Sequence, residues 1–109
     1  MLLKNKDQVL PLKNSATVAL VGPLADSKFN MLGTWSVSSD HAKSVTVLEG
    51  LKNAGANVVY AKGANLSDDT ALAKRVNAFN KQVAIDQRSP DAMLQEAVSI
   101  AAKAESKIV

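Results

Sequence analysis

The stretch Thr17-Val-Ala-Leu-Val-Gly-Pro-Leu-Ala-Asp26 decides the fold of this chain. Residues 18–22 are all apolar or glycine, without the polar alternation that marks a strand covered on one face only. Gly22-Pro23 then stops the strand, because proline fixes φ and has no N–H for the sheet ladder. The sequence therefore predicts an inner strand of a parallel sheet over Thr17–Gly22, with the rest of the chain arranged around it.

Downstream of this strand the pattern alternates between helix and strand. Thr46 and Glu49 have the spacing of a capping box, which predicts a short helix over about Val47–Ala54. Gly55 suits the left-handed position after its last turn. The apolar run in Asn57–Lys62 predicts a second inner strand. The expected apolar face of the helix consists of Val47, Leu48, Leu51 and Ala54.

Two more helices are expected before the end of the chain. Ser67-Asp68-Asp69 caps the first, and apolar spacings of four, three and four extend it to Val83. Ser89-Pro90-Asp91 starts the second, with serine as N-cap and proline at the first helical position. Ile108-Val109 begins a further apolar segment. The predicted apolar faces are Leu72, Val76, Phe79 and Val83 for the first helix, and Met93, Leu94, Ala97, Val98 and Ala101 for the second.

Strands that alternate with helices imply an α/β fold with a parallel sheet flanked by helices. Two or three parallel strands cannot cover both faces of their inner members. We therefore expect the chain to be the N-terminal part of a larger α/β domain with flavodoxin-like layering. The uncovered sheet edge and faces also predict self-association.

Composition excludes several classes of protein. Hydrophobic residues make up 47% of the 109 residues and aromatic residues 4%, which predicts one aliphatic core. The net charge is +3, but the lysines are scattered from Lys4 to Lys107, whereas a nucleic-acid surface needs clustered basic residues. There is no cysteine for disulfides or thiolate metal sites, and no apolar run approaches the ~20 residues of a membrane span. We expect no nucleic-acid or membrane partner.

The N-terminus does not have the features of a signal peptide. It lacks a long apolar core and a small-residue cleavage site. Met1 is therefore interpreted as an added start on an internal segment, or as the start of a mature form cut elsewhere.

Candidate chemical groups are few, and each has a structural alternative. Gly22 is followed by Pro23 instead of the glycines of a dinucleotide-binding turn, so a strand stop is favoured. His41, the single histidine, is better explained as a loop residue on the surface than as part of a triad. Asp68-Asp69 is explained by helix capping. No cofactor or metal is expected.

The roles of two loop residues remain open. Asp26 follows the C-terminal end of the first strand, where open α/β sheets place ligands, but it could equally bond local backbone. Trp35 lies in the long irregular segment from Leu24 to Asp40 and could be either a platform for a sugar ring or an anchor for the loop. These residues do not form a complete catalytic constellation.

The ordered set of short motifs resembles the C-terminal α/β-sandwich domain of glycoside hydrolase family 3 β-glucosidases, in particular the bacterial periplasmic branch. The resemblance covers Leu2 to Val109. It rests on Leu2-Leu-Lys-Asn5, Leu10-Pro-Leu12, Val21-Gly-Pro-Leu-Ala-Asp26, Gly33-Thr-Trp-Ser36, Val45-Thr-Val-Leu-Glu-Gly-Leu-Lys52, Tyr60-Ala-Lys-Gly63, Arg88-Ser-Pro90 and Glu96-Ala-Val98.

The resemblance implies retaining, exo-acting hydrolysis of β-glucosides or oligosaccharides by a longer, periplasmic parent enzyme. In the family an aspartate nucleophile comes from a preceding barrel domain, and the acid/base glutamate comes from further along the sandwich domain. Residues 1–16 would be the linker into that domain and residues 17–109 its incomplete N-terminal part. No catalytic residue maps onto this chain, which should be an inactive scaffold piece on its own.

The resemblance also points to a substrate-facing loop over Gly33 to Asp40. Trp35 and Ser39 are its candidate substrate-binding residues, with Ser39 at a position where some plant members have a second tryptophan. Relatives have an unbroken apolar strand near the end of this region, whereas Lys107 interrupts it here, so a frayed or rebuilt strand is expected. The residues alone leave open a small flavodoxin-like ligand-binding or regulatory domain with no hydrolase parent.

Overall fold

A parallel sheet forms the centre of the molecule, with β1 (Thr17–Val21) between β2 (Asn57–Ala61) and β3 (Ser106–Ile108). The computed structural model describes residues 4–8, 10–13, 15–33, 36, 40–78 and 83–109. Thr17 pairs with Asn57 in the register between β1 and β2. The α/β class and parallel sheet predicted from the sequence are confirmed.

The central strand is also the most buried one. Val18, Ala19 and Leu20 expose 1%, 0% and 2% of their surface. This agrees with the unbroken apolar run in the sequence, because a strand between two neighbours and two helix layers contacts no water.

β2 was expected to be a second inner strand, and that prediction is wrong for the part of the chain that the structure describes. Its residues alternate between exposed and half-buried up to Ala61, and Val59 exposes 37% of its surface. The strand lies at one edge of the sheet, so only one of its sides is paired. Apolar content alone cannot distinguish such an edge strand from an inner one.

β3 forms in register with β1, with Val18 opposite Ser106 and Leu20 opposite Ile108. The expectation of a frayed or rebuilt strand is therefore wrong. Lys107 is exposed, because β3 is the other edge strand of this sheet and its lysine reaches water.

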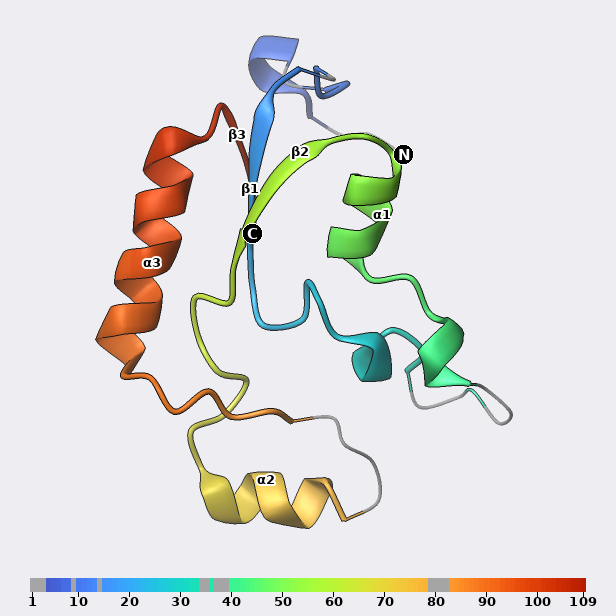
Figure 1. Ribbon diagram of the computed structural model, residues 1–109, viewed down its shortest axis with the longest axis vertical. Helices are drawn as coiled ribbons and strands as arrows, with labels where there is room; N and C mark the ends of the chain where they lie inside the picture. Colours follow the sequence, from blue (N-terminus) through green and yellow to red (C-terminus); the bar gives the residue numbers. More distant parts are fainter. Residues whose placement is uncertain (1–3, 9, 14, 34–35, 37–39, 79–82) are drawn as a thin grey trace.

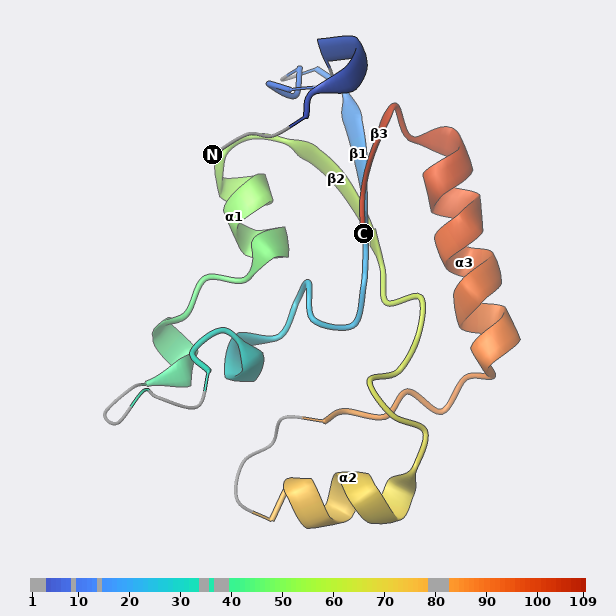
Figure 2. The ribbon, with the colours of Figure 1, turned by 180° about the vertical axis from the view of Figure 1, so that it is seen from behind.

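Helices α1 (Val47–Asn53) and α3 (Pro90–Lys103) lie on opposite sides of the sheet (Figures 1 and 2). The predicted capping box at the start of α1 is present, and Gly55 after its end has a φ of 81°. Ser89 caps α3 through the backbone N–H of Ala92, and Pro90 is its first residue. Both helix starts were therefore predicted correctly.

The apolar faces of these helices are narrower than predicted. Leu48 is the buried residue of α1, whereas Val47 exposes 43% of its surface. In α3 Met93 and Ala97 are buried, but Leu94 and Val98 expose 57% and 60%. In the described chain, apolar residues next to the buried ones in each helix therefore face solvent.

Helix α2 (Thr70–Val76) is shorter than the sequence indicated. Its N-cap is Asp69, and it ends before Asn77, whose side chain bonds the backbone N–H and carbonyl of Val83 at 3.0 and 2.7 Å. The predicted extension to Val83 is therefore wrong, and Phe79 lies outside the described residues. Ala73 is the buried residue of α2, while Leu72 is 36% exposed.

The segments that follow β1 and β2 gather beyond the carboxyl ends of these strands (Figure 1). They comprise the 3-10 turns η2 (Lys28–Asn30) and η3 (His41–Lys43) together with α2. The turn η1 (Lys6–Gln8) lies near the opposite, amino end of the sheet. The carboxyl edge is therefore the place to look for a site, as in other open α/β sheets.

Candidate functional site

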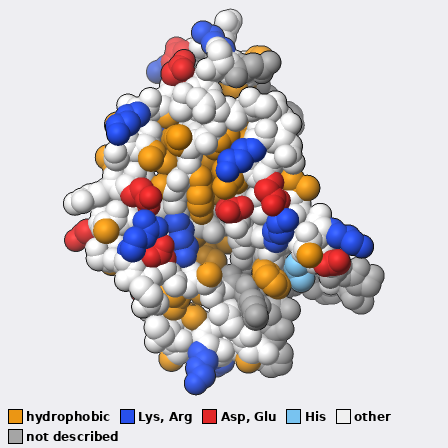
Figure 3. Space-filling view, viewed as in Figure 1, with side chains coloured by type: hydrophobic (Ala, Val, Ile, Leu, Met, Phe, Trp, Pro, Cys, Tyr) orange, Lys and Arg blue, Asp and Glu red, His pale blue; other side chains and the backbone are white. Residues whose placement is uncertain are grey.

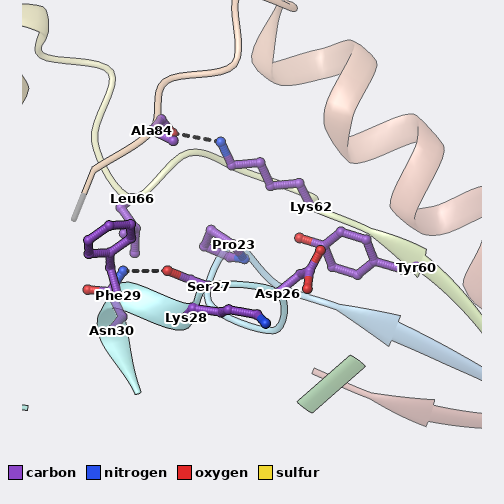
Figure 4. A pocket seen from close by; sticks show the side chains of 10 residues that line it. All are labelled: Pro23, Asp26, Ser27, Lys28, Phe29, Asn30, Tyr60, Lys62, Leu66 and Ala84. Carbon is purple, nitrogen blue, oxygen red and sulfur yellow. Dashed lines mark hydrogen bonds between the residues drawn. The ribbon is translucent and has the colours of Figure 1, made fainter. Parts of the chain in front are cut away.

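A cavity of about 400 Å³ opens at the carboxyl ends of β1 and β2 (Figure 4). One wall is the loop from Pro23 to Asn30, and another is formed by Tyr60 and Lys62 at the end of β2. The remaining residues that line it are Leu66 and Ala84. Its volume is in the range of small-molecule pockets, and its lining combines carboxylate, ammonium, hydroxyl and aromatic groups.

Tyr60 connects the ends of the two strands. Its half-buried hydroxyl donates a hydrogen bond to the carbonyl oxygen of Gly22 at 3.1 Å. Burial raises the pKa of Tyr60, and the negative charges of Asp26 and Glu96 add to this effect. The phenol therefore stays neutral at physiological pH and can accept one more hydrogen bond from a ligand.

Within the described part of the chain Asp26 bonds a distant side chain and no local backbone group, so the backbone alternative is not the one found there. Its Oδ1 accepts a hydrogen bond from the hydroxyl of Thr46 at 3.0 Å, across 20 residues of sequence. Among the described residues no hydrogen bond reaches its Oδ2. Asp26 thus lies at the cavity as expected from its position after β1, but half of its carboxylate has a structural partner.

Lys62 fixes the far wall of the cavity. Its ammonium group donates to the carbonyl oxygen of Ala84 at 2.7 Å (Figure 4). It also donates to Asn65 Oδ1 at 2.8 Å. Asn65 in turn bonds both the backbone N–H and the carbonyl of Asp86, at 2.9 and 3.0 Å. These contacts hold the segment before α3 against the segment after β2, and they use two of the three ammonium protons.

Phe29 lines the cavity, and its ring is stacked on that of His41 from η3. Their rings stack with centroids 5.1 Å apart and an interplanar angle of 29°. His41 is half-buried, so the prediction of a plain surface residue was only partly correct. Within the described chain the buried Nδ1 of His41 has no hydrogen-bond partner. The described residues also contain no group of three acidic or histidine side chains suited to a metal ion.

Trp35 and Ser39, the substrate-binding candidates from the sequence, lie outside the described residues. The two ends of their loop are described. Gly33 follows η2, and Asp40 caps η3 by accepting from the backbone N–H of Ala42 at 3.0 Å. The loop therefore leaves and rejoins the described structure beyond the carboxyl end of β1.

Asp69 has the capping role predicted for it, whereas Asp68 does not cap the helix, so the prediction is wrong for Asp68. Asp69 accepts hydrogen bonds from the backbone N–H groups of Ala71 and Leu72 at 2.9 and 3.0 Å. Asp68 accepts from the side-chain amide of Asn65 at 2.9 Å. Neither carboxylate is placed on the cavity wall.

A second cavity, of about 500 Å³, lies at the carboxyl ends of β1 and β3. Apart from Asn30 its lining is apolar or glycine, and it includes Leu20, Met31, Val47 and Ile108. None of its described lining residues has a charged side chain to offer a polar substrate. The first cavity is therefore the better candidate for contacts with a sugar or another polar ligand.

Tyr60, Lys62 and Lys28 were not identified as site residues from the sequence. Tyr60 and Lys62 lie at the carboxyl end of a parallel strand, which was the signal available for them. Nothing in the sequence indicates that Lys28 reaches an acidic residue 21 positions away.

The whole chain, residues 1–109, matches the glycosyl hydrolase family 3 C-terminal domain. It is 48% identical over 108 residues to the periplasmic beta-glucosidase of Salmonella typhimurium. The aligned region covers 96% of this chain and 14% of that protein. The periplasmic location predicted from the resemblance agrees with that name.

Two further relatives are each 36% identical. The thermostable beta-glucosidase B of Acetivibrio thermocellus matches over 84 residues, 74% of this chain and 11% of that protein. The xylan 1,4-beta-xylosidase of Xylanibacter ruminicola matches over 73 residues, 66% of this chain and 8% of that protein. The chain thus spans a small part of the curated relatives it matches.

The described residues contain no helix of the length and apolar character needed to cross a bilayer. Charged side chains of both signs are interspersed on the face shown in Figure 3, and lysine and arginine do not gather into one patch there. The parallel sheet, the carboxyl-edge site and the match over all 109 residues agree with one another. This chain belongs to the glycosyl hydrolase family 3 C-terminal domain family.

Proposed function

We propose that this chain is part of a β-glucosidase that hydrolyses terminal β-D-glucosyl residues with retention of configuration. The observation that carries the proposal is the family match over residues 1–109, together with 48% identity to a protein named periplasmic beta-glucosidase. Two of the three relatives described above are named beta-glucosidases, and the third is a beta-xylosidase. A β-glucoside is therefore the preferred substrate class, and a β-xyloside is the alternative to be tested.

In this proposal the chain is a scaffold that lends one loop to the active site. Residues 1–16 connect it to a preceding barrel domain, and residues 17–109 begin the α/β-sandwich domain. The loop over Gly33–Asp40 contributes Trp35 as a platform for a sugar ring and Ser39 as a further substrate-binding residue. The carboxyl edge from which this loop departs is where parallel α/β sheets place their ligands, which supports the assignment.

The carboxylates at and around the described site support a scaffold role rather than a catalytic one, and of those named below only Asp26 lines the cavity. Retaining glycosidases need two carboxyl groups about 5 Å apart that are available to the substrate. Here Asp26 accepts from Thr46, Glu49 pairs with Lys28, and Asp86 and Glu96 pair with an arginine. We therefore place the nucleophile and the acid/base in other parts of the parent enzyme, and we propose a periplasmic location for that enzyme.

Hydrolysis of nitrophenyl β-D-glucoside tests this proposal. The protein expressed from the complete coding sequence should release nitrophenol from the β-glucoside faster than from the β-xyloside. The 109-residue chain alone should release none. Activity of the chain alone, with contamination excluded by a mock purification, would contradict the scaffold role. A complete protein that prefers the xyloside would overturn the substrate assignment.

A further inference from the structure

We propose that Asp26, Lys28, Thr46 and Glu49 form a clamp, the loop clamp, that fixes both ends of the segment Met31–Asp40. Lys28 is then a positioning residue for substrate binding in the parent enzyme, an inference that rests on the proposed role of this segment as an active-site loop. Lys28 itself does not need to touch the substrate. Its proposed effect on substrate binding comes from holding the ends of the loop in place.

The entry to the segment is attached to the start of α1 by three contacts. The carbonyl oxygen of Ala25 accepts from the backbone N–H of Leu48 at 3.1 Å. Asp26 Oδ1 accepts from the hydroxyl of Thr46 at 3.0 Å. The ammonium of Lys28 lies 3.0 Å from Glu49 Oε1. Every contact joins the loop after β1 to the first turn of the helix.

The first turn of α1 is itself closed by the capping box. The hydroxyl oxygen of Thr46 accepts from the backbone N–H of Glu49, and Glu49 Oε2 accepts from the N–H of Thr46, both at 3.1 Å. Thr46 exposes only 1% of its surface. Its buried hydroxyl has a partner in both roles, because it donates to Asp26 and accepts from the N–H of Glu49. Glu49 divides its two oxygens between Thr46 and Lys28.

The exit of the segment is attached to the same lysine. Lys28 Nζ lies 3.5 Å from the carbonyl oxygen of Ala42 in η3. Next to it, the ring of Phe29 from η2 stacks on His41. The chain before residue 31 and the chain after residue 40 are thus joined directly, and both are joined to α1.

The loop clamp contains two contacts, from Asp26 and Lys28, that capping of α1 does not require. A capping box needs only the N-cap residue and the acid three positions later. Asp26 and Lys28 come from another segment and satisfy groups of that box, so their effect is to tie the loop to the helix. Joining the ends of a loop restricts the conformations of the residues between them. This matters for an active-site loop, because small displacements of a substrate-positioning group weaken substrate binding and catalysis.

Kinetics of the complete protein with Lys28→Met test the inference. Methionine keeps most of the apolar stem of the lysine, while the ion pair and the contact with Ala42 are lost. We expect KM for cellobiose to rise about tenfold, equivalent to about 1.4 kcal/mol, with a smaller change in kcat. Lys28→Arg should restore a KM within a factor of about two to three, because the charge is kept.

Glu96→Gln is the matched control. Glu96 pairs with Arg88 on the surface at 2.7 Å and its side chain is 42% exposed, close to the 39% of Glu49. It lies in α3, away from the loop clamp, and should leave KM unchanged. A role limited to general stability would lower the melting temperature in the Lys28 and Glu96 variants alike and would not separate KM from kcat.

Hydrogen–deuterium exchange of the same proteins separates the clamp from the enzymatic proposal. Peptides covering residues 24–44 should exchange faster in Lys28→Met than in the wild type, and should not change in Glu96→Gln. If the complete protein does not cleave β-glucosides, the proposed function fails while this measurement still tests the clamp. Unchanged exchange in Lys28→Met, or unchanged KM in an active enzyme, would overturn the inference. If Lys28→Met does not fold, Asp26→Ala, which removes the oxygen that accepts from Thr46, replaces it in both measurements with the same expectations.

Discussion

Thr46 shows how much a single buried hydroxyl can organise. Its capping role could be predicted from the sequence, because the box spans only three residues. Its bond to Asp26 could not, since nothing local relates residues 20 positions apart. The same holds for Lys28, whose partner Glu49 is fixed only by the folded arrangement.

Replacing Thr46 by valine should destabilise the protein by about 1–2 kcal/mol. Valine keeps the shape, but Asp26 and the backbone N–H of Glu49 both lose their partner. Urea unfolding followed by circular dichroism measures the change. Thr46→Ser keeps the hydroxyl and should lose about 1 kcal/mol or less, mainly from the missing methyl group. Equal stability of the valine variant and the wild type would show that the hydroxyl contributes nothing.

Helices and strands were located well where their starting signals are local. The capping residues at Thr46 and Ser89 marked the starts of α1 and α3. The end of α2 was missed because the side chain of Asn77 bonds Val83 instead of letting the helix continue. The exposure of β2 and β3 follows from their positions at the edges of the sheet. These positions depend on pairing between distant segments, so they cannot be predicted from the residues of either strand alone.

The segment before α3 is held by Arg88, which pairs with Asp86 and with Glu96 at 2.7 Å each. Hydrogen bonds from the Arg88 side chain and then from its backbone lower the pKa of Asp86 from 3.8 to about 2. These bonds favour the ionised carboxylate in the folded state. Their contribution to stability is therefore fully present above about pH 3.8 and is lost as the pH falls toward 2.

Acid unfolding of Asp86→Asn checks this sign. The free energy of unfolding should fall less steeply for the variant than for the wild type between pH 3.8 and about 2, because one titrating group is gone. Above this window the wild type should be the more stable protein. A difference between the two that stays constant across the window would contradict the assignment.

At the level of the whole chain, the fold class and family followed from the sequence, while the site followed only in part. The buried run of β1 and the alternation of elements were enough for a parallel α/β sheet. Asp26 was correctly placed at the carboxyl edge. The cavity itself combines Tyr60, Lys62 and Ala84 from separate segments, and such a combination is visible only after folding.

Self-association of the 109-residue chain is expected from its exposed apolar residues. Val59 on an edge strand exposes 37% of its surface, and Leu94 and Val98 on α3 expose 57% and 60%. Multi-angle light scattering over a concentration series should show a mass that rises above that of a monomer. Replacing Leu94 and Val98 by serine should shift the series toward monomer. A monomer at all concentrations would refute this expectation.

The central claim is that the carboxyl edge of this sheet presents its long loop to the substrate. Steady-state kinetics of Trp35→Ala in the complete protein, with cellobiose as substrate, test it most directly. The loss of a sugar-stacking surface should lower kcat/KM about tenfold, or by about 1.4 kcal/mol, with an unchanged melting temperature. Values of kcat/KM and melting temperature equal to those of the wild type would contradict the claim.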